Sequence, residues 1–323
     1  MKAAIATAYG PPEVVQVTNM DTPVPAADEV LVRTHAATVT ASDRAFRSGN
    51  PRIARLFSGL RRPKKPVLGT EFAGEVAAVG SAVTRFAVGD RVFGAADLNL
   101  GAHAEYIRVK ENGAVVAMPA NLSYTEAVTL VDGTGLVFLR DHAKAHSGQS
   151  ILINGASGGV GAVAVQFARH YGADVTAVCS GAGAELVKRL GASEVIDYTR
   201  TDFTAQGRTY DIVFDVAGVS SFGRCHQLLN PGGRYLTPVP SLGIMVRAPW
   251  TALTRGRRRA VIAFTGLRPA ASKAKDLALV KELAEAGTLV PVVDQAFPID
   301  HIVDAYRHID RQGKRGITVI EMP

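Results

Sequence analysis

A glycine-rich turn at residues 155–161 is the clearest chemical signal in the sequence. It follows an apolar run at 150–154 and precedes small and apolar residues at 162–168. Glycines let a backbone approach phosphate groups closely, and the first N–H groups of a following helix attract negative charge. A plain tight turn uses the same residues, but the position between strand and helix favours a dinucleotide pyrophosphate site. The predicted cofactor-binding residues of this turn are Gly155, Ala156, Ser157, Gly158, Gly159, Val160 and Gly161.

The strand that follows this turn predicts which nucleotide is bound. An Asp or Glu at the end of the second strand of such a domain holds the ribose hydroxyls of NAD. Here that strand ends in Cys179-Ser180-Gly181, which contains no acid. Without the carboxylate there is no repulsion of a 2′-phosphate, so the sequence favours NADP(H) over NAD(H), with Ser180 as a candidate phosphate ligand.

The elements that must position these residues change character along the chain. Up to about residue 120, short apolar runs are punctuated by Gly and Pro, which predicts a β-rich region. From about 121, strands and helices alternate, which predicts parallel strands joined by crossover helices. Ile262-Ala263-Phe264-Thr265 is the expected last strand of that sheet, and 316–320 alternates like a returning strand.

Three further motifs place the glycine turn in a family. They read Leu68-Gly69-Thr70-Glu71-Phe72-Ala73-Gly74-Glu75-Val76, Val88-Gly89-Asp90-Arg91-Val92 and Asp211-Ile212-Val213-Phe214-Asp215. Together with the mid-chain glycines, they resemble the medium-chain dehydrogenase/reductase superfamily, in particular its zinc-independent quinone oxidoreductase branch. The resemblance implies an α/β protein. A GroES-like β-rich catalytic domain is expected at 1–120 and 267–323, and a Rossmann domain with a doubly wound parallel sheet at 121–266.

A short-chain dehydrogenase is the competing family for such glycines. Its nucleotide domain would start near the N-terminus, and a Tyr-x-x-x-Lys pair would follow the glycines. The one such pair here, Tyr106 with Lys110, precedes them.

The resemblance also implies that no zinc is bound. Zinc members carry Cys and His where this chain has Thr40 and Thr70. Their third ligand falls near Val131 of this chain. A hydroxyl or a valine does not replace thiolate or imidazole as a strong zinc ligand. Hydride transfer without a Lewis acid suits an acceptor that is already electrophilic, such as a quinone or an α,β-unsaturated carbonyl. Thr40 and Thr70 are then candidate catalytic hydrogen-bond donors, although each could equally cap a helix or tie loops together.

Further cofactor contacts are implied by the resemblance alone. Lys188 and Tyr198 would lie near Ser180 at the 2′-phosphate, and the last Rossmann strand would bring Phe264, Thr265 and Gly266 near the nicotinamide. The superfamily also places Lys314 and Arg315 near the cofactor. Each of these could instead be ordinary core or a solvated charge.

Composition limits the partners. The chain has 323 residues, a net charge of +7 and only two cysteines, Cys179 and Cys225. Without an export signal, this favours a reducing, cytoplasmic location. No stretch predicts a membrane span, and the basic clusters lack the interleaved aromatics typical of nucleic-acid sites. We expect a small-molecule substrate, no nucleic-acid or membrane partner and, from the resemblance, a homodimer formed through the last Rossmann strand.

The first functional hypothesis is an NADPH-dependent, zinc-independent reductase of quinones or α,β-unsaturated carbonyls. A zinc-independent NADP-dependent alcohol dehydrogenase is the second. A nucleotide-binding regulatory protein without turnover is the third, because Thr40, Ala45 and Gly135 stand where active relatives often have other residues.

Overall fold

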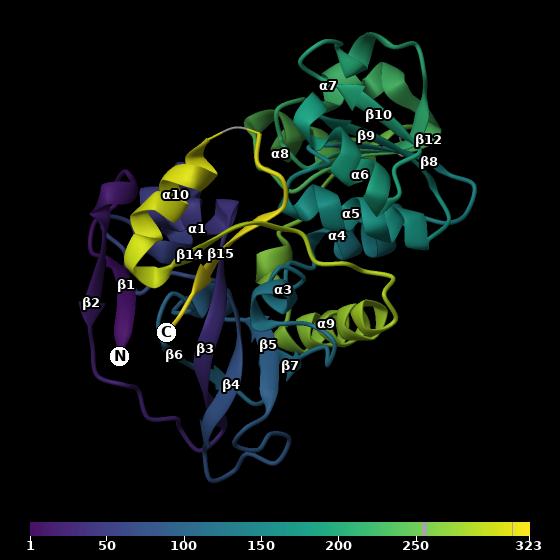
Figure 1. Ribbon diagram of the computed structural model, residues 1–323. Helices are drawn as coiled ribbons and strands as arrows, with labels where there is room; N and C mark the ends of the chain where they lie inside the picture. The colour runs from purple at the N-terminus through teal and green to yellow at the C-terminus, as the bar shows by residue number, and fades with distance from the viewer. Residues whose placement is uncertain (254–256, 312) are drawn as a thin grey trace. The chain divides into compact units, whose positions relative to one another are not determined.

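The computed structural model describes residues 1–253, 257–311 and 313–323 and divides into two compact units (Figure 1). One unit comprises Met1–Val131, Gly266–Gly287 and Pro291–Pro323. The other comprises Asp132–Thr265 and Thr288–Val290. No helix among the described residues is long and apolar enough to cross a membrane.

The first unit is built around a β-sheet in the order β14-β15-β3-β4-β5-β7, with β6 pairing to β3, and beside it β1 and β2 form a two-stranded ribbon (Figure 1). The pairs are antiparallel except β14 with β15. Its strands are β1 (Lys2–Ala6), β2 (Val15–Asn19), β3 (Glu29–Val39), β4 (Glu71–Val79), β5 (Arg91–Ala95), β6 (Tyr106–Lys110), β7 (Ala114–Ala117), β14 (Val293–Pro298) and β15 (Ile317–Glu321). Its helices are α1 (Ala41–Ser48), α2 (Arg55–Ser58), α3 (Tyr124–Val128), α9 (Ala270–Glu285) and α10 (Ile302–Asp310).

The core of this unit lies between the sheet and α10. Phe72, Val92 and Ile320 from three strands pack in one cluster with Ile302 and Tyr306 of α10. Burial of these large apolar side chains is the main force that holds the C-terminal segments against the N-terminal strands.

The second unit contains a wholly parallel sheet in the order β10-β9-β8-β11-β12-β13. Its strands are β8 (Ser150–Asn154), β9 (Asp174–Cys179), β10 (Glu194–Asp197), β11 (Tyr210–Asp215), β12 (Leu229–Thr237) and β13 (Arg259–Ile262). Its helices are α4 (Thr134–Val137), α5 (Gly159–His170), α6 (Ala184–Leu190), α7 (Phe222–Cys225) and α8 (Leu242–Leu253).

The strand order of this sheet creates a ligand site at one edge. From β8 the chain adds β9 and then β10 on one side of the sheet. It then returns to the other side of β8 and adds β11, β12 and β13. Ligands of such sheets bind beyond the carboxyl ends of the strands where the order reverses. In this sheet that point is the end of β8, where the glycine turn begins.

Two boundaries differ from those expected from the sequence. Residues 121–131 belong to the first unit, because α3 packs against β3, β4 and β5. Residues 288–290 belong to the second unit, where the Gln166 side chain donates to the Val290 carbonyl at 3.1 Å and accepts from its N–H at 2.7 Å. The last strand, β13, ends at Ile262, so the expectation of a strand at 262–265 was wrong by three residues.

Gly135 has a packing role in this unit. A Cβ at this position would lie 3.1 Å from the backbone of Ala164. Glycine therefore lets α4 approach α5 closely, and this accounts for Gly135 without reference to activity.

Candidate functional site

The glycine turn joins the end of β8 to the start of α5. Gly155 has φ = +83°, a backbone conformation that residues other than glycine rarely adopt. The N–H groups of Gly155 and Ala156 both donate to the Val178 carbonyl. Gly158 caps α5 without a side-chain hydrogen bond to the helix. The first N–H groups of α5 therefore receive no capping side chain from Gly158, which suits them to bind an anion.

Gly161 makes the turn tight. An added Cβ would lie 2.1 Å from the Gly155 carbonyl oxygen and 2.8 Å from the Ala156 Cα. These distances exclude any side chain without movement of the backbone, so glycine at this position keeps α5 directly against the turn.

Asp215 at the end of β11 holds the loops around this edge of the sheet. Its carboxylate is fully buried and accepts from the Asn154 amide at 2.8 Å and the Gly218 N–H at 3.0 Å. It also accepts from the Ser220 N–H and the Tyr235 hydroxyl, both at 2.9 Å. In the sequence, Asp215 is recognisable only as the last residue of a family motif. A carboxylate ending an apolar strand is the signal that points to this role, because a buried charge must be fully hydrogen-bonded.

Ser180 and Tyr198 are neighbours at the end of β9. The Tyr198 N–H donates to the Cys179 carbonyl at 3.1 Å, and the Tyr198 side chain is exposed. Ser180 makes no side-chain cap to the following turn. Lys188 lies exposed in the last turn of α6. The structure thus brings Ser180 and Tyr198 together and leaves the ammonium of Lys188 in solvent.

Asp197, on the neighbouring strand β10, brings a carboxylate beside the acid-free end of β9. Its carboxylate, at the end of β10, lies so close to Gly181 that a Cβ there would be 2.8 Å from Oδ2. Oδ1 accepts from the Thr199 hydroxyl at 2.7 Å and the Thr199 N–H at 2.9 Å. The bond from the Thr199 hydroxyl, followed by that from its N–H, holds the pKa of Asp197 below its usual range. The carboxylate is therefore charged at neutral pH.

A second consequence of this charge appears at Cys179. Burial, followed by the Asp197 carboxylate, raises the pKa of this thiol to about 11. Cys179 is therefore protonated at neutral pH and does not act as a nucleophile.

The residues after β13 take different positions. Phe264 is exposed, and the Thr265 hydroxyl hydrogen-bonds that of Thr134 at 2.8 Å. The Gly266 carbonyl accepts from the Lys273 ammonium at 2.6 Å. Thr265 therefore anchors the chain to α4, and Gly266 belongs to the first unit.

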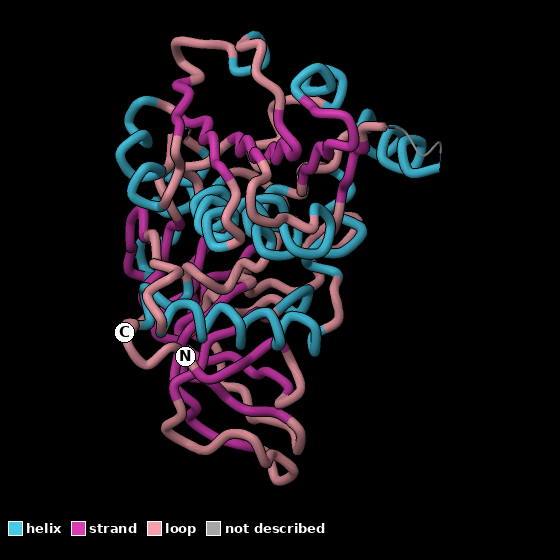
Figure 2. Tube along the Cα trace, turned by 90° about the vertical axis from the view of Figure 1, so that its right-hand side faces the viewer, coloured by secondary structure: helices cyan, strands magenta, loops and turns pink. Residues whose placement is uncertain are grey.

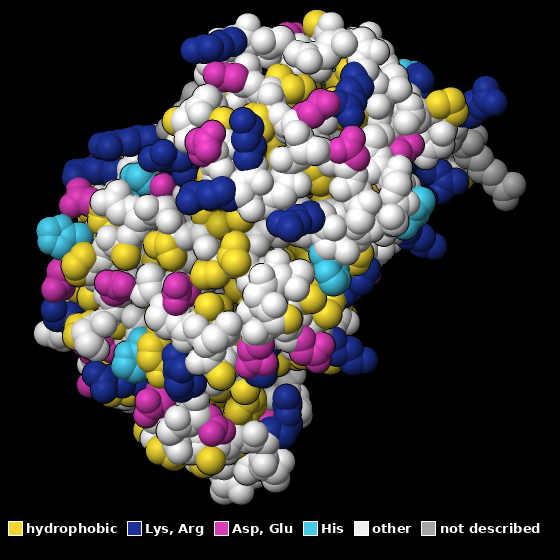
Figure 3. Space-filling model, turned by 45° about the vertical axis from the view of Figure 1, so that its right-hand side comes forward, with side chains coloured by type: hydrophobic (Ala, Val, Ile, Leu, Met, Phe, Trp, Pro, Cys, Tyr) yellow, Lys and Arg dark blue, Asp and Glu magenta, His cyan; other side chains and the backbone are white. Residues whose placement is uncertain are grey.

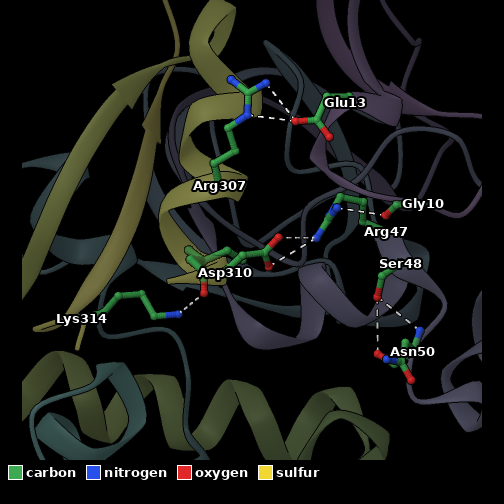
Figure 4. A network of polar contacts seen from close by, with 9 residues as sticks. Gly10, Glu13, Arg47, Ser48, Asn50, Arg307, Asp310 and Lys314 are labelled. Carbon is green, nitrogen blue, oxygen red and sulfur yellow. Dashed lines mark hydrogen bonds and ion pairs between the residues drawn. The ribbon is translucent and has the colours of Figure 1, made fainter. Parts of the chain in front are cut away.

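Lys314 and Arg315 make contacts within the first unit. The Lys314 ammonium donates to the Ile309 carbonyl at the end of α10 (Figure 4). Burial, followed by the charge of Arg44, lowers the pKa of Lys314. The Arg315 N–H donates to Asp294 at 3.3 Å. The Lys314 ammonium thus hydrogen-bonds the carbonyl end of α10, while its burial disfavours the charged form.

Asp43 joins the two threonines that stand at zinc-ligand positions. The Thr40 hydroxyl donates to Asp43 Oδ2 at 2.7 Å, and the Thr70 hydroxyl donates to Oδ1 at 3.2 Å. Thr40 also begins α1 as its capping residue, accepting from the Asp43 N–H. Both hydroxyl protons are therefore directed at the buried Asp43, and the arrangement favours a tying role for each threonine. Asp43 follows Thr40 by three positions, and the sequence alone does not show that it also reaches Thr70.

Val131, which the resemblance places near the third zinc-ligand position, is buried. Among the described residues, no three His, Cys, Asp or Glu side chains gather in a metal-binding cluster.

Comparison with known proteins identifies the family. Residues 26–120 match the alcohol dehydrogenase GroES-like domain, and residues 190–320 match the zinc-binding dehydrogenase family. The mitochondrial NAD(P)H oxidoreductase RTN4IP1 of Bos taurus is 32% identical over 358 residues, covering 100% of this chain and 89% of that protein. The trans-enoyl reductase pgmF of Aspergillus terreus is 31% identical, covering 91% of this chain and 86% of that protein.

A solved structure shows the same architecture. The quinone oxidoreductase from Coxiella burnetii superimposes with a TM-score of 0.88 at 25% identity, covering 100% of this chain and 99% of that one. The two units are thus a GroES-like domain and a Rossmann-type domain, and the predicted fold class is confirmed. The chain belongs to the medium-chain dehydrogenase/reductase superfamily, in its quinone oxidoreductase-like branch. It is an oxidoreductase of that superfamily, as the sequence predicted.

Proposed function

We propose that the protein is a zinc-independent, NADPH-dependent reductase of quinones or α,β-unsaturated carbonyls. The main observation in favour of a bound nucleotide is the glycine turn, which has no capping side chain at Gly158 and no room for a Cβ at Gly161. The relatives named as NAD(P)H oxidoreductase, quinone oxidoreductase and trans-enoyl reductase support the acceptor class. Bound nicotinamide would supply the hydride.

The contribution of this chain is to hold the nucleotide and to prepare the acceptor. The proposed cofactor residues of the Rossmann-type domain are the turn at 155–161 with Ser180, Lys188, Tyr198, Phe264 and Thr265. Gly266, Lys314 and Arg315 are the proposed contacts from the GroES-like domain. Thr70 is the better of the two threonines as a hydrogen-bond donor to the acceptor oxygen, because its 3.2 Å bond to Asp43 is longer and weaker than the 2.7 Å bond of Thr40. Thr40 and Asp43 would keep that hydroxyl in place.

The preference for NADPH depends on whether the Asp197 carboxylate is available to bind a ribose hydroxyl. Oδ1 already accepts two hydrogen bonds from Thr199, and Arg200 lies 3.7 Å from Oδ2. The carboxylate is therefore committed to its own turn rather than to a ribose hydroxyl. The Ser180 hydroxyl, with no capping bond, is the better candidate for a 2′-phosphate.

Replacing Asp197 by asparagine should increase the preference for NADPH. The amide still accepts from Thr199 but removes a negative charge beside Gly181. We expect the ratio of kcat/KM for NADPH to that for NADH to rise by roughly three- to tenfold, the effect of one unit charge several ångströms away near the surface. Steady-state kinetics with both nucleotides measure this ratio.

Asp174→Asn is the matched control, because Asp174 starts β9 at the opposite edge of the sheet. Its ratio should equal that of the wild type. An unchanged or lower ratio in Asp197→Asn would mean that its charge does not act on the 2′-phosphate.

The proposed reaction is tested by following NADPH oxidation with a quinone panel and then a conjugated-enone panel, each with a chelator. Turnover that survives chelation supports the proposal. Alcohol-dependent reduction of NADP under the same conditions would favour the dehydrogenase instead. NADPH binding by titration with no turnover on any panel would favour a regulatory protein, an outcome consistent with both threonine hydroxyls being directed at Asp43.

We further propose a cytoplasmic homodimer that acts on small molecules and not on nucleic acid. The dimer would form through β13, which stands last in the sheet order. Cys179 and Cys225 are both free and buried, which fits a reducing compartment. Light scattering that shows a monomer would argue against the dimer.

A further inference from the structure

Helix α8 turns an apolar stripe toward solvent. Leu242 is 90% exposed, Val246 70%, Trp250 64% and Leu253 83%. At 100° per residue these four side chains lie within an arc of about 80° on the helix. Ile244 and Thr251, which are buried, lie on the opposite face. The helix therefore packs on the sheet through one side and carries a second apolar side that is largely exposed. In Figure 2, α8 is the helix beside the grey trace.

The segment around this stripe is strongly basic. From Val216 to Lys275 the sequence contains ten Lys and Arg residues and no Asp or Glu. Arg247, Arg257 and Arg258 line a groove of about 490 Å³ together with Phe222 and Trp250. Around the grey atoms at the upper right of Figure 3, dark blue basic side chains lie on the surface with hydrophobic ones in yellow.

The groove lies away from the nucleotide site of the same domain. Pro231 and Arg257, both in its lining, are at the amino ends of β12 and β13. The glycine turn follows the carboxyl end of β8, which runs parallel to these strands. The groove, and the end of the stripe at Trp250, therefore lie at the opposite edge of the sheet from the cradle for the pyrophosphate.

We propose that this surface, formed by the α8 stripe and the three arginines, docks onto an anionic lipid bilayer. An apolar helix face that includes a tryptophan, bordered by arginines, is the pattern of a helix that lies in a membrane interface. The leucines and Val246 would enter the acyl boundary, Trp250 would lie at headgroup depth and the guanidinium groups would bind lipid phosphates. Nucleic acid would leave the apolar stripe exposed, so the charge alone does not account for the surface.

A second copy of the chain is the competing occupant. A partner that pairs with the edge of β13 extends the sheet in its own plane. The stripe lies on the face of α8 opposite its buried side, so it faces away from the sheet and such a partner leaves it accessible. The proposed docking surface thus departs from the expectation of no membrane partner. The sequence of 242–253 alone does not show which of its apolar residues pack on the sheet and which face solvent.

The only tryptophan of the chain reports directly on this surface. With the full-length protein, we expect the Trp250 emission to shift to the blue on addition of phosphatidylglycerol/phosphatidylcholine vesicles and to be quenched by brominated lipid. Co-sedimentation with these vesicles should be strong at low salt and weak at high salt. Vesicles of phosphatidylcholine alone should bind at least about tenfold less, because several arginines each contribute attraction to an anionic surface.

Two variants separate the apolar and charged parts. Leu242→Ser/Val246→Ser/Leu253→Ser and Arg247→Gln/Arg257→Gln/Arg258→Gln should each weaken vesicle binding by at least about tenfold. Matched controls in the GroES-like domain replace side chains that are also exposed. These controls are Val24→Ser/Leu56→Ser/Leu60→Ser and Arg52→Gln/Arg61→Gln/Arg62→Gln, which should bind as the wild type does.

Three results would overturn the proposal. The first is an unchanged Trp250 emission with no co-sedimentation on anionic vesicles at low salt. The second is a stripe variant that turns a dimer into a monomer while the wild type ignores vesicles, which assigns the surface to a second copy. The third is binding to a single-stranded oligonucleotide, equal in wild type and stripe variant, with no vesicle binding. NADPH oxidation in solution is a separate measurement, so the vesicle experiments test membrane docking independently of the proposed reaction.

Discussion

Replacing Gly161 by alanine is expected to weaken nucleotide binding by at least about tenfold and to lower the free energy of unfolding by about 1–3 kcal/mol, the cost of forcing atoms into a filled space. The new Cβ would lie 2.1 Å from the Gly155 carbonyl oxygen, so the turn must open. Alanine favours a helix by about 1 kcal/mol relative to glycine, which acts in the opposite direction. A net loss of stability therefore shows that the close approach outweighs helix propensity. Urea denaturation and NADPH titration measure the two effects.

Gly158→Ala is the control within the same turn. Its φ of −76° is open to any residue, and an added Cβ would meet only the Gly155 carbonyl oxygen at an ordinary 3.5 Å. The free energy of unfolding should change little. If Gly161→Ala were as stable as Gly158→Ala and bound NADPH as the wild type does, the tight turn would not be needed for binding.

The part of the site that the sequence predicted is local in the chain. The glycine turn, the strand before it and the helix after it lie within about twenty residues, and glycine and apolar residues indicate this geometry by their own conformational limits. The family motifs extended that local signal to both domains, which the comparisons confirmed. The assignment of Thr40 and Thr70 to zinc-ligand positions rests on the family resemblance and stays a prediction.

The part that the sequence did not predict depends on which strands and helices are neighbours. Asp197 follows Ser180 by 17 positions and reaches Gly181 only because β10 pairs with β9. Thr40 and Thr70 meet at Asp43 through contacts between α1 and the start of β4. The hydrogen bond from the Lys314 ammonium to the Ile309 carbonyl at the end of α10 is likewise a partner that the sequence does not indicate. Side-chain partners of this kind are set by tertiary packing, which no local pattern encodes.

Replacing Arg47 by methionine is expected to destabilise the GroES-like domain by about 2–4 kcal/mol, somewhat below the usual cost of breaking a buried ion pair because one partner is partly exposed. Arg47 has a side chain only 3% exposed and pairs with Asp310 at 3.0 Å, as Figure 4 shows. It also donates to the Gly10 carbonyl at 2.9 Å and lies over the Tyr306 ring. Methionine keeps much of the apolar stem but leaves the Gly10 carbonyl and Asp310 without their partner. Chemical denaturation followed by circular dichroism measures the loss.

The Arg307–Glu13 pair in the same view provides the comparison. Both of its side chains are about half exposed, so water and salt screen the attraction and Arg307→Met should have a far smaller effect. High salt should weaken the Arg307–Glu13 contact and leave the cost of Arg47→Met nearly unchanged, because burial excludes the screening ions. Arg47→Lys should not restore stability, since an ammonium cannot hold Gly10 and Asp310 in the geometry of a guanidinium. Equal losses of stability for the two methionine variants would contradict the idea that burial of an ion pair sets the cost of breaking it.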